Sequence, residues 1–322
     1  MDGLLVVDKP AGVTSHDVVA RIRRVLRERS VGHTGTLDPL ATGVLPLVLG
    51  RATRLARFLS ASDKSYDAVI RFGFSTDTGD AEGTAIDETD RSSAPPVPSP
   101  DAIDRALGGF RGTFLQQPPA FSAKKIAGTR SYRLARAASA ASPPSLLRPS
   151  CVPPASLLRP QSVPVTVHDL RLLAIEGPQI TLHIRCSAGF YVRSLAHDLG
   201  TQLGLGAHLT ALRRTRSGDC TLDDAMTLDQ AERNPAEAAQ RVIPLARMVP
   251  SLPSMTLTPD GVRRARHGRD IGPADLEQGV GFRDSGLGSQ PYVRLLNRAG
   301  DLVGIAVPAA VPGLLHPSVV LM

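Results

Sequence analysis

One carboxylate in the sequence stands in a setting that suits nucleophilic chemistry. Asp38 lies in GHTGTLDPLATGVLP (residues 32–46), a stretch rich in glycine, threonine and proline that cannot form one regular element. Pro39 restricts the residue before it to extended backbone, so the direction of the Asp38 side chain is predicted to be fixed. An ionised carboxylate held in this way can attack an electron-poor carbon. An aspartate in a Gly/Pro loop is also typical of an ordinary turn or helix cap, and the pattern alone leaves that alternative open.

The loop around Asp38 combines glycines with apolar residues. Three glycines would let another backbone, such as that of a nucleotide, approach closely: Gly32, Gly35 and Gly43. Three leucines are predicted to shield the carboxylate from water: Leu37, Leu40 and Leu45. Because desolvation raises the pKa of a carboxyl group, such a site would need a nearby cation to keep the group ionised.

Regular elements are predicted on both sides of this loop. A short strand is expected at 3–7, and Ser15 is expected to cap a helix that runs to about Arg27. Apolar periodicity predicts further strands at 66–74, 165–175 and 179–186, and further helices at 52–59, 101–108, 191–203 and 228–240.

Composition divides the chain into segments. A Pro/Ser linker at 91–100 is followed later by an Ala/Ser/Pro-rich stretch at 137–164, which contains the near-duplication PPSLLRPS and PASLLRPQS. That stretch is predicted to be a mobile surface insertion, because it has no apolar periodicity. After about residue 250 short segments alternate with Gly and Pro, which predicts a small β-rich domain at 250–322 with strands near 291–296 and 301–307.

Charge and cysteine usage exclude some classes of protein. The net charge is +7 and the isoelectric point is about 9.8, which favours a polyanionic partner, although a bias toward arginine explains the same numbers. The three cysteines are scattered and form no CxxC pair, so neither a zinc site nor a disulfide framework is predicted. No apolar run reaches the roughly 20 residues of a membrane span, and the N-terminus does not have the pattern of a signal peptide. A cytoplasmic protein is expected.

The segment around Asp38 resembles the active-site motif of the TruB family of pseudouridine synthases. Other segments similar to that family follow in the same order. These are LLVVDKPAGVTSHDVV (4–19), SDKSYDAVIRFG (62–73), TDTGDAEG (76–83), QPPAFSAKKIAGTRSYRLAR (117–136), CSAGFYVRSLAHDLG (186–200) and GAHLTALRRTRSG (206–218). The resemblance covers residues 3–245 apart from the 137–164 stretch, and it implies isomerisation of one uridine in the T-loop of tRNA to pseudouridine.

The resemblance implies roles for individual residues. Asp38 would attack the target nucleotide, Tyr66 would stack on the flipped uracil near the departing C5 proton, and Arg193 would pair with Asp38. Tyr191 and Leu212 would line the base pocket, His33 would fill the space left in the opened T-loop, and Lys9 is expected in the same site. Taken without the resemblance, Tyr66 reads as a half-buried strand aromatic, Arg193 as a surface charge and His33 as a loop residue.

The resemblance also implies partners and architecture. It predicts a monomer that binds the T-stem-loop of tRNA without a guide RNA, a protein partner, a metal or a cofactor. The fold would be α+β: a catalytic domain at 1–249 with a curved, largely antiparallel sheet and flanking helices, and a PUA-like domain at 250–322. An RNA-gripping insertion would span about 91–136. The expected phosphate contacts are Lys64, Arg51, Lys124, Lys125, Arg130, Arg213 and Arg214, with Arg54, Arg57 and Arg216 beside them.

Two further classes of function remain open from the sequence. One is an RNA-binding or RNA-folding factor without catalysis, and the other is an N-glycosylase that releases the free base. The chain also departs from the family at Phe121, where a tyrosine is usual, so no hydroxyl contact is expected from that position.

Overall fold

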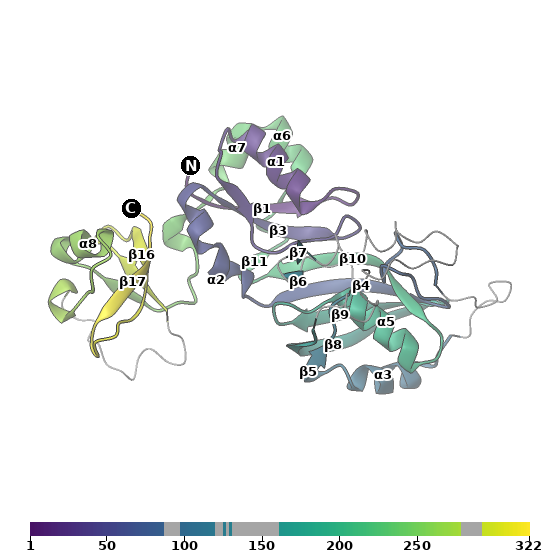
Figure 1. Ribbon diagram of the computed structural model, residues 1–322. Coiled ribbons are helices and arrows are strands. Elements are labelled where there is room, and N and C mark those ends of the chain that lie inside the picture. The colour runs from purple at the N-terminus through teal and green to yellow at the C-terminus, as the bar shows by residue number, and fades with distance from the viewer. Residues whose placement is uncertain (87–96, 120–124, 127–128, 131–160, 278–291) are drawn as a thin grey trace, which may run out of the picture. The chain divides into compact units, whose positions relative to one another are not determined.

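The structure, a computed structural model, describes the chain except for residues 87–96, 120–124, 127–128, 131–160 and 278–291. It contains two compact units (Figure 1). Unit 1 consists of residues 1–37, 45–60 and 223–322, and unit 2 of residues 38–44 and 61–222. Sheets and helices occur in both units, so the predicted mixed α/β class is confirmed.

Unit 2 is built on an antiparallel sheet. Its strands follow the order β10 (Ala207–Ser217), β4 (Lys64–Phe72), β9 (Gln179–Cys186), β8 (Val163–Glu176) and β5 (Gly112–Gln116), and each pairs antiparallel with its neighbour. β11 (Cys220–Thr221) extends β10 as a hairpin. The first residues of β3 (Thr42–Leu49) lie parallel to β10, with Thr42 opposite Arg213 and Gly43 opposite Arg214.

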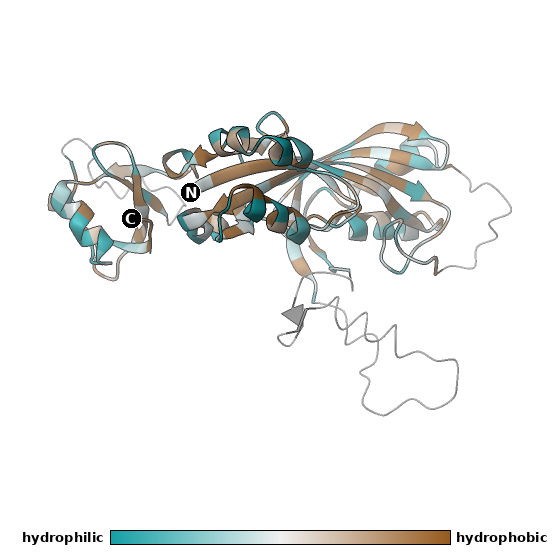
Figure 2. Ribbon diagram, turned by 90° about the horizontal axis from the view of Figure 1, so that it is seen from above, coloured by the Kyte–Doolittle hydropathy of each residue, from teal (hydrophilic) through white to brown (hydrophobic). Residues whose placement is uncertain are grey.

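Two helices complete the core of unit 2. α3 (Pro100–Gly108) contributes Ile103 and Leu107, and α5 (Val192–Gln202) contributes Leu195 and Leu199, to a cluster that includes the inward residues of β4, β8, β9 and β10. Strands that alternate between core and solvent bury every second residue, as the pattern of β9 shows. In Figure 2 brown, apolar residues predominate along the strands, whereas the helices carry both brown and teal residues.

Unit 1 begins with a strand and a capped helix. β1 (Gly3–Lys9) pairs parallel with β12 (Met226–Thr227) and antiparallel with β13 (Ile243–Pro244), and β2 (Val31–His33) pairs antiparallel with the end of β3. Helix α1 spans Ser15–Val25, and Thr14, rather than the predicted Ser15, is its N-cap. Thr14 and Asp17 form a capping box in which each side chain binds the other's backbone N–H.

The remaining helices of unit 1 are short. Residues 50–60 form a 3-10 helix (Gly50–Leu55) followed by α2 (Ala56–Ser60), where one helix over 52–59 was predicted. The helix predicted at 228–240 is interrupted, because Asn234 ends α6 (Leu228–Arg233) and caps α7 (Pro235–Gln240). Proline is favoured at the first helical position, which explains the restart.

The C-terminal segment of unit 1 has its own sheet, in the order β14 (Ser254–Thr256), β15 (Val293–Leu296), β16 (Leu302–Pro308) and β17 (Leu315–Val320). These strands share a core with α8 (Pro259–Arg266), a helix that the sequence analysis did not predict. Within the described ranges, no helix has the length and apolar character of a membrane span.

Candidate active site

Asp38 and Arg193 form an ion pair in unit 2. The Arg193 Nε lies 3.0 Å from the Asp38 Oδ2. The Arg193 side chain is 7% exposed, whereas the Asp38 side chain is 40% exposed, so the predicted shielding of the carboxylate by leucines is incomplete. One face of the carboxylate is therefore open to an incoming molecule, while its charge is balanced by a buried guanidinium.

Helix α5 places Arg193 in its first turn. The N-cap residue, Tyr191, makes no side-chain capping bond. Gln116 at the end of β5 takes that role: its Oε1 accepts from the Tyr191 N–H at 2.8 Å, and its Nε2 donates to the Tyr191 carbonyl at 3.0 Å. Gln116 is 1% exposed, so this bidentate contact fixes the start of the helix and the position of Arg193 beside it.

A second carboxylate holds Arg193 from another side. Asp80 is 4% exposed, and its Oδ2 lies 3.6 Å from Arg193 Nη1, which also donates to the Thr78 carbonyl at 3.0 Å. The Thr78 hydroxyl donates to Asp80 Oδ1 at 2.6 Å. Asp80 lies in the segment TDTGDAEG (76–83), and no pattern in the sequence singles this residue out.

The loop with Asp80 is joined to strand β10 by backbone hydrogen bonds. The Leu209 N–H donates to the Gly79 carbonyl at 3.0 Å, and the Ala81 N–H donates to the Leu209 carbonyl at 2.9 Å. The loop is closed further along by Asp77 N–H to the Thr84 carbonyl at 2.9 Å. The carboxylate that orients Arg193 is thus positioned by the sheet itself.

The Asp38 loop is also tied to β10. The Ala41 N–H donates to the Asp38 carbonyl at 3.0 Å, which closes a turn. Gly43 has φ +101°, and a Cβ there would collide with the Arg214 backbone. The close approach that this glycine permits is therefore to the chain's own strand, where the sequence analysis expected room for another molecule such as a nucleotide.

Tyr66 on β4 lies on the same face of the sheet as two residues of β10. Leu212 pairs with Ala68 and Arg214 pairs with Tyr66 in the register of the two strands. Tyr66 is half-buried and packs on the core with Leu40 and Leu212. Burial raises the pKa of the Tyr66 phenol, and a charge interaction and hydrogen bond with Arg214 oppose that rise, while the negative charge of Asp38 adds to it.

Two predicted site residues, Lys9 and His33, belong to unit 1. Lys9 is fully buried, and its ammonium donates to the carbonyls of Pro10 at 2.9 Å and Val13 at 2.7 Å. The His33 ring makes an edge contact with His16, with centroids 5.6 Å apart.

The predicted phosphate contacts fall into several groups. Lys64 is 6% exposed and Arg214 is 1% exposed, so both lie in the interior of unit 2 and not on a surface that a phosphate would reach. Arg51 binds the Asp2 carboxylate and the Leu321 carbonyl.

Beside Arg51, Arg54 donates to the Val320 carbonyl at 2.5 Å and Arg57 to the Ser318 hydroxyl at 3.2 Å, so this part of unit 1 uses its arginines to hold β17. Arg213 is half-buried and lies 3.4 Å from the Thr42 hydroxyl.

The remaining predicted RNA contacts lie on two short strands or outside the described residues. Lys125 and Arg130 lie on the paired strands β6 (Lys125–Ile126) and β7 (Thr129–Arg130). Lys124, Phe121, most of the 91–100 linker and most of the 137–164 stretch lie outside the described residues.

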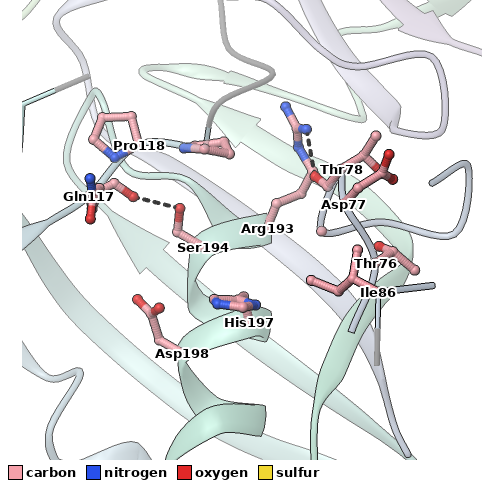
Figure 3. A pocket seen from close by; sticks show the side chains of 12 residues that line it. Thr76, Asp77, Thr78, Ile86, Gln117, Pro118, Arg193, Ser194, His197 and Asp198 are labelled. Atoms are coloured by element: carbon pink, nitrogen blue, oxygen red, sulfur yellow. Dashed lines mark hydrogen bonds between the residues drawn. The ribbon is translucent and has the colours of Figure 1, made fainter. Parts of the chain in front are cut away.

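A cavity lies beside Arg193 in unit 2, with a volume of about 160 Å³ (Figure 3). Ser194, His197 and Asp198 line it from successive turns of α5, and the segments 76–79 and 117–119 form other walls. The Ser194 hydroxyl donates to the Gln117 carbonyl at 2.8 Å, which joins two of these walls. Among the described residues, no group of three or more His, Cys, Asp or Glu side chains is arranged to hold a metal ion.

Comparisons with family models and with known proteins point to the same family. Residues 23–148 match the model for the TruB family pseudouridylate synthase (N terminal domain), and residues 193–251 match the tRNA pseudouridylate synthase B C-terminal domain. The chain is 44% identical to the tRNA pseudouridine synthase B of Solibacter usitatus (strain Ellin6076), over 100% of both chains. It is 41% identical to the protein of that name from Thermobifida fusca (strain YX), over 96% of this chain and 98% of the relative.

Solved structures show the same fold. A chain in the crystal structure of a Cbf5-Nop10-Gar1 complex aligns with a TM-score of 0.69 and 26% identity, over 99% of this chain and 85% of that one. A chain in the structure of an H/ACA RNP bound to a substrate RNA containing 2'-deoxyuridine aligns with a TM-score of 0.67 and 24% identity, over the same shares of the two chains.

Proposed function

Because this chain belongs to the TruB family of pseudouridine synthases, we propose that it isomerises uridine-55 in the T-loop of tRNA, with Asp38 as the attacking carboxylate. It is an isomerase that converts uridine in tRNA to pseudouridine. The observation that carries the assignment to Asp38 is its ion pair with Arg193, in which the cation is buried and the anion is open on one side.

The reaction needs one nucleophile and a path for one proton. The N1–C1′ bond of the nucleoside breaks, the uracil turns, and C5 joins C1′. The Asp38 carboxylate attacks either C1′ as uracil departs or the base ring, and covalent assistance of either kind divides one difficult step into easier ones. The proton on C5 is finally removed and N1 gains one. Atoms and charge balance without redox or group transfer.

Arg193 balances the charge of the nucleophile and orients it. Its Nε faces Asp38, and its Nη1 is engaged by Thr78 and Asp80. A guanidinium with these partners cannot turn away from Asp38 without leaving a buried acceptor unsatisfied, which costs about 1–3 kcal/mol. The nucleophile is therefore held in position before the RNA arrives.

The target base must leave the RNA stack to reach Asp38. Unstacking costs a few kcal/mol, and contacts in the protein must offset it. We assign Tyr66, Leu40 and Leu212 to the apolar wall that receives the uracil, because all three are partly buried against the same core and Leu40 belongs to the Asp38 loop. Tyr191, fixed by Gln116, would form the rim of that pocket, and Lys9 and His33 keep the roles that the resemblance implies as part of the proposal.

The wider assignment extends to the partner and the domains. We assign the T-stem-loop of tRNA as substrate, bound by a monomer in the cytoplasm without a guide RNA. Residues 250–322 would be a PUA-like RNA-binding domain that follows a catalytic domain at 1–249, which is supported by the separate core of β14–β17 and α8. Arg213, Lys124, Lys125 and Arg130 remain the proposed phosphate contacts.

Substitution of Asp38 tests the chemistry. Asp38→Asn should abolish pseudouridine formation in a tRNA T-arm while leaving tRNA affinity within about tenfold, because the amide keeps the shape of the carboxylate but cannot attack. Asp67→Asn is a matched control, since this aspartate lies on β4 and its carboxylate pairs with His183 at 2.8 Å.

Three outcomes separate the alternatives. Full turnover by Asp38→Asn would refute the proposed nucleophile. An abasic site in the product RNA would identify an N-glycosylase, and tRNA binding by the wild-type chain without any conversion would identify an RNA-folding factor.

A further inference from the structure

Arg214 is a buried arginine whose side chain lies beside the active-site tyrosine. It is 1% exposed and stands opposite Tyr66 where β10 pairs with β4. Its Nε donates to the Val44 carbonyl at 2.7 Å, which fixes the plane of the guanidinium. The side chain also makes a hydrogen bond with Tyr66. Since a guanidinium carries only donors, the phenol oxygen is the acceptor in that bond.

The charged and titratable groups around the Tyr66 hydroxyl come from several elements. Arg214 faces it from β10, the Cys186 thiol from β9 and the Asp38 carboxylate from its loop. Lys64 lies two residues before Tyr66 on the same face of β4 and is 6% exposed. Burial raises the pKa of the phenol, so the hydroxyl rests in its neutral form, and Arg214 lowers the energy of the ionised form.

A buried cation is not needed to fill this space. An apolar side chain would fill the interior of a sheet without the cost of taking a charge out of water. A hydrogen bond from a fixed guanidinium to a phenol oxygen has two specific effects: it leaves the phenol O–H to point toward the other side of the oxygen, and it stabilises negative charge on that oxygen.

We propose that Arg214 is a positioning residue that enables the Tyr66 hydroxyl to carry the proton that moves from C5 to N1 during the isomerisation. The inference rests on the proposed function. In this relay the phenol gives its proton to N1 of the departing uracil. After the C5–C1′ bond forms, the C5–H bond breaks, its electron pair restores the ring double bond, and the phenolate takes the proton. Tyr66 ends as it began, and the product has gained the N1 proton that C5 lost.

The relay requires one hydroxyl to be first neutral and then negatively charged, and Arg214 makes the second state possible. The phenol must be neutral when the uracil leaves and must hold negative charge for a short time afterwards. Burial meets the first demand, and the guanidinium meets the second. Arg214 acts only through Tyr66, so its contribution should vanish when the hydroxyl is absent.

A double-mutant cycle tests this dependence. Single-turnover rates of pseudouridine formation in a tRNA T-arm are compared for wild type, Arg214→Gln, Tyr66→Phe and the double variant. We expect Arg214→Gln to lower the rate at least tenfold in wild type and less than about twofold in the Tyr66→Phe background. Equal effects in the two backgrounds would overturn the proposal.

Further readouts separate positioning from general support of the fold. With a substrate deuterated at C5, the isotope effect should be larger for Arg214→Gln than for wild type, because proton removal becomes slower. The pKa of the Tyr66 phenol, followed by NMR with labelled tyrosine, should rise in Arg214→Gln. An unchanged isotope effect and an unchanged phenol pKa would mean that Arg214 has a structural role only.

Two variants guard against misfolding and unspecific effects. Arg214→Lys keeps a buried cation, so it should fold and retain more activity than Arg214→Gln. If Arg214→Lys lowers the rate equally in the wild-type and Tyr66→Phe backgrounds, the inference fails even if Arg214→Gln does not fold. Arg185→Gln removes an exposed arginine from β9 and should leave the rate unchanged. Wild-type enzyme that forms no pseudouridine would refute the proposed function itself, and an additive cycle in an active enzyme refutes only the relay.

Discussion

Replacing Lys64 by methionine should change how stability depends on pH. Lys64 is 6% exposed and lies between Cys186 on β9 and Ser217 on β10. Burial, followed by repulsion from Arg214, lowers the pKa of the Lys64 ammonium from 10.5 to about 8. Methionine has a similar length and no charge to desolvate, so Lys64→Met removes the titration and keeps most of the packing.

The sign of the effect follows from the number of bound protons. Between about pH 8 and about pH 10.5 the unfolded chain keeps the Lys64 proton and the folded chain loses it, so the wild type gains stability as pH rises. A shift from 10.5 to about 8 corresponds to about 3 kcal/mol when the whole range is crossed. Cys186 stays neutral in this window, because burial raises the pKa of its thiol to about 12.

Urea unfolding at several pH values measures this effect. The free energy of unfolding of Lys64→Met minus that of wild type should fall by about 2–3 kcal/mol between about pH 7 and about pH 10. Other titrating groups are common to both proteins and cancel in the difference. Lys64→Arg is the control, because its charge does not titrate in this range, and its difference from Lys64→Met should be constant. If the difference in unfolding free energy between Lys64→Met and wild type changes by less than about 0.5 kcal/mol over this pH range, the reasoning from burial is refuted.

Three other substitutions test contacts described above. Asp80→Asn should slow pseudouridine formation at least tenfold in single-turnover assays, with tRNA affinity within about threefold, because Arg193 loses one of its two carboxylates. Gly43→Ala should lower the free energy of unfolding by about 2 kcal/mol or more, measured in urea, because its Cβ would meet the Arg214 backbone at a positive φ. Arg51→Ala should change tRNA affinity less than about threefold in filter binding, because this side chain, 53% exposed, is already engaged within unit 1.

Each of these has an outcome that contradicts it. Normal turnover by Asp80→Asn would mean that the Asp80 carboxylate is not needed to orient Arg193. A Gly43→Ala variant as stable as wild type would show that the loop can move away from β10. A large loss of tRNA affinity in Arg51→Ala would return that arginine to the phosphate contacts that the sequence analysis expected.

Local patterns in the sequence predicted much of the fold. The strand at 179–186 has the predicted bounds, and the helix predicted at 191–203 differs by one residue at each end. The link between Asp38 and Arg193 came from the family motifs, since no local pattern joins two residues so far apart in the sequence. The prediction that they pair is met by the 3.0 Å contact, and their catalytic roles stay proposals.

The burial of charged residues was the feature hardest to predict from the sequence. Arg213 and Arg214 look alike in a basic stretch, but a strand directs neighbours to opposite faces, so one is half-buried and the other is fully inside. Interpreting 207–216 as a strand would have placed Arg214 on the same face as Leu212. The pairing of Asp80 could not be predicted, because its partner Arg193 comes from a distant helix and its loop looks like an ordinary polar turn.

The backbone bonds that join residues 79–81 to β10 have a consequence for how this family can diverge. A polar Gly-containing surface loop usually accepts gains and losses of residues. Here a single deletion would shift Asp80 out of step with Leu209 and draw its oxygen away from Arg193. In a laboratory evolution experiment, codon deletions at 77–83 should therefore be purged from active libraries, while point substitutions at the exposed Ala81 and Glu82 survive.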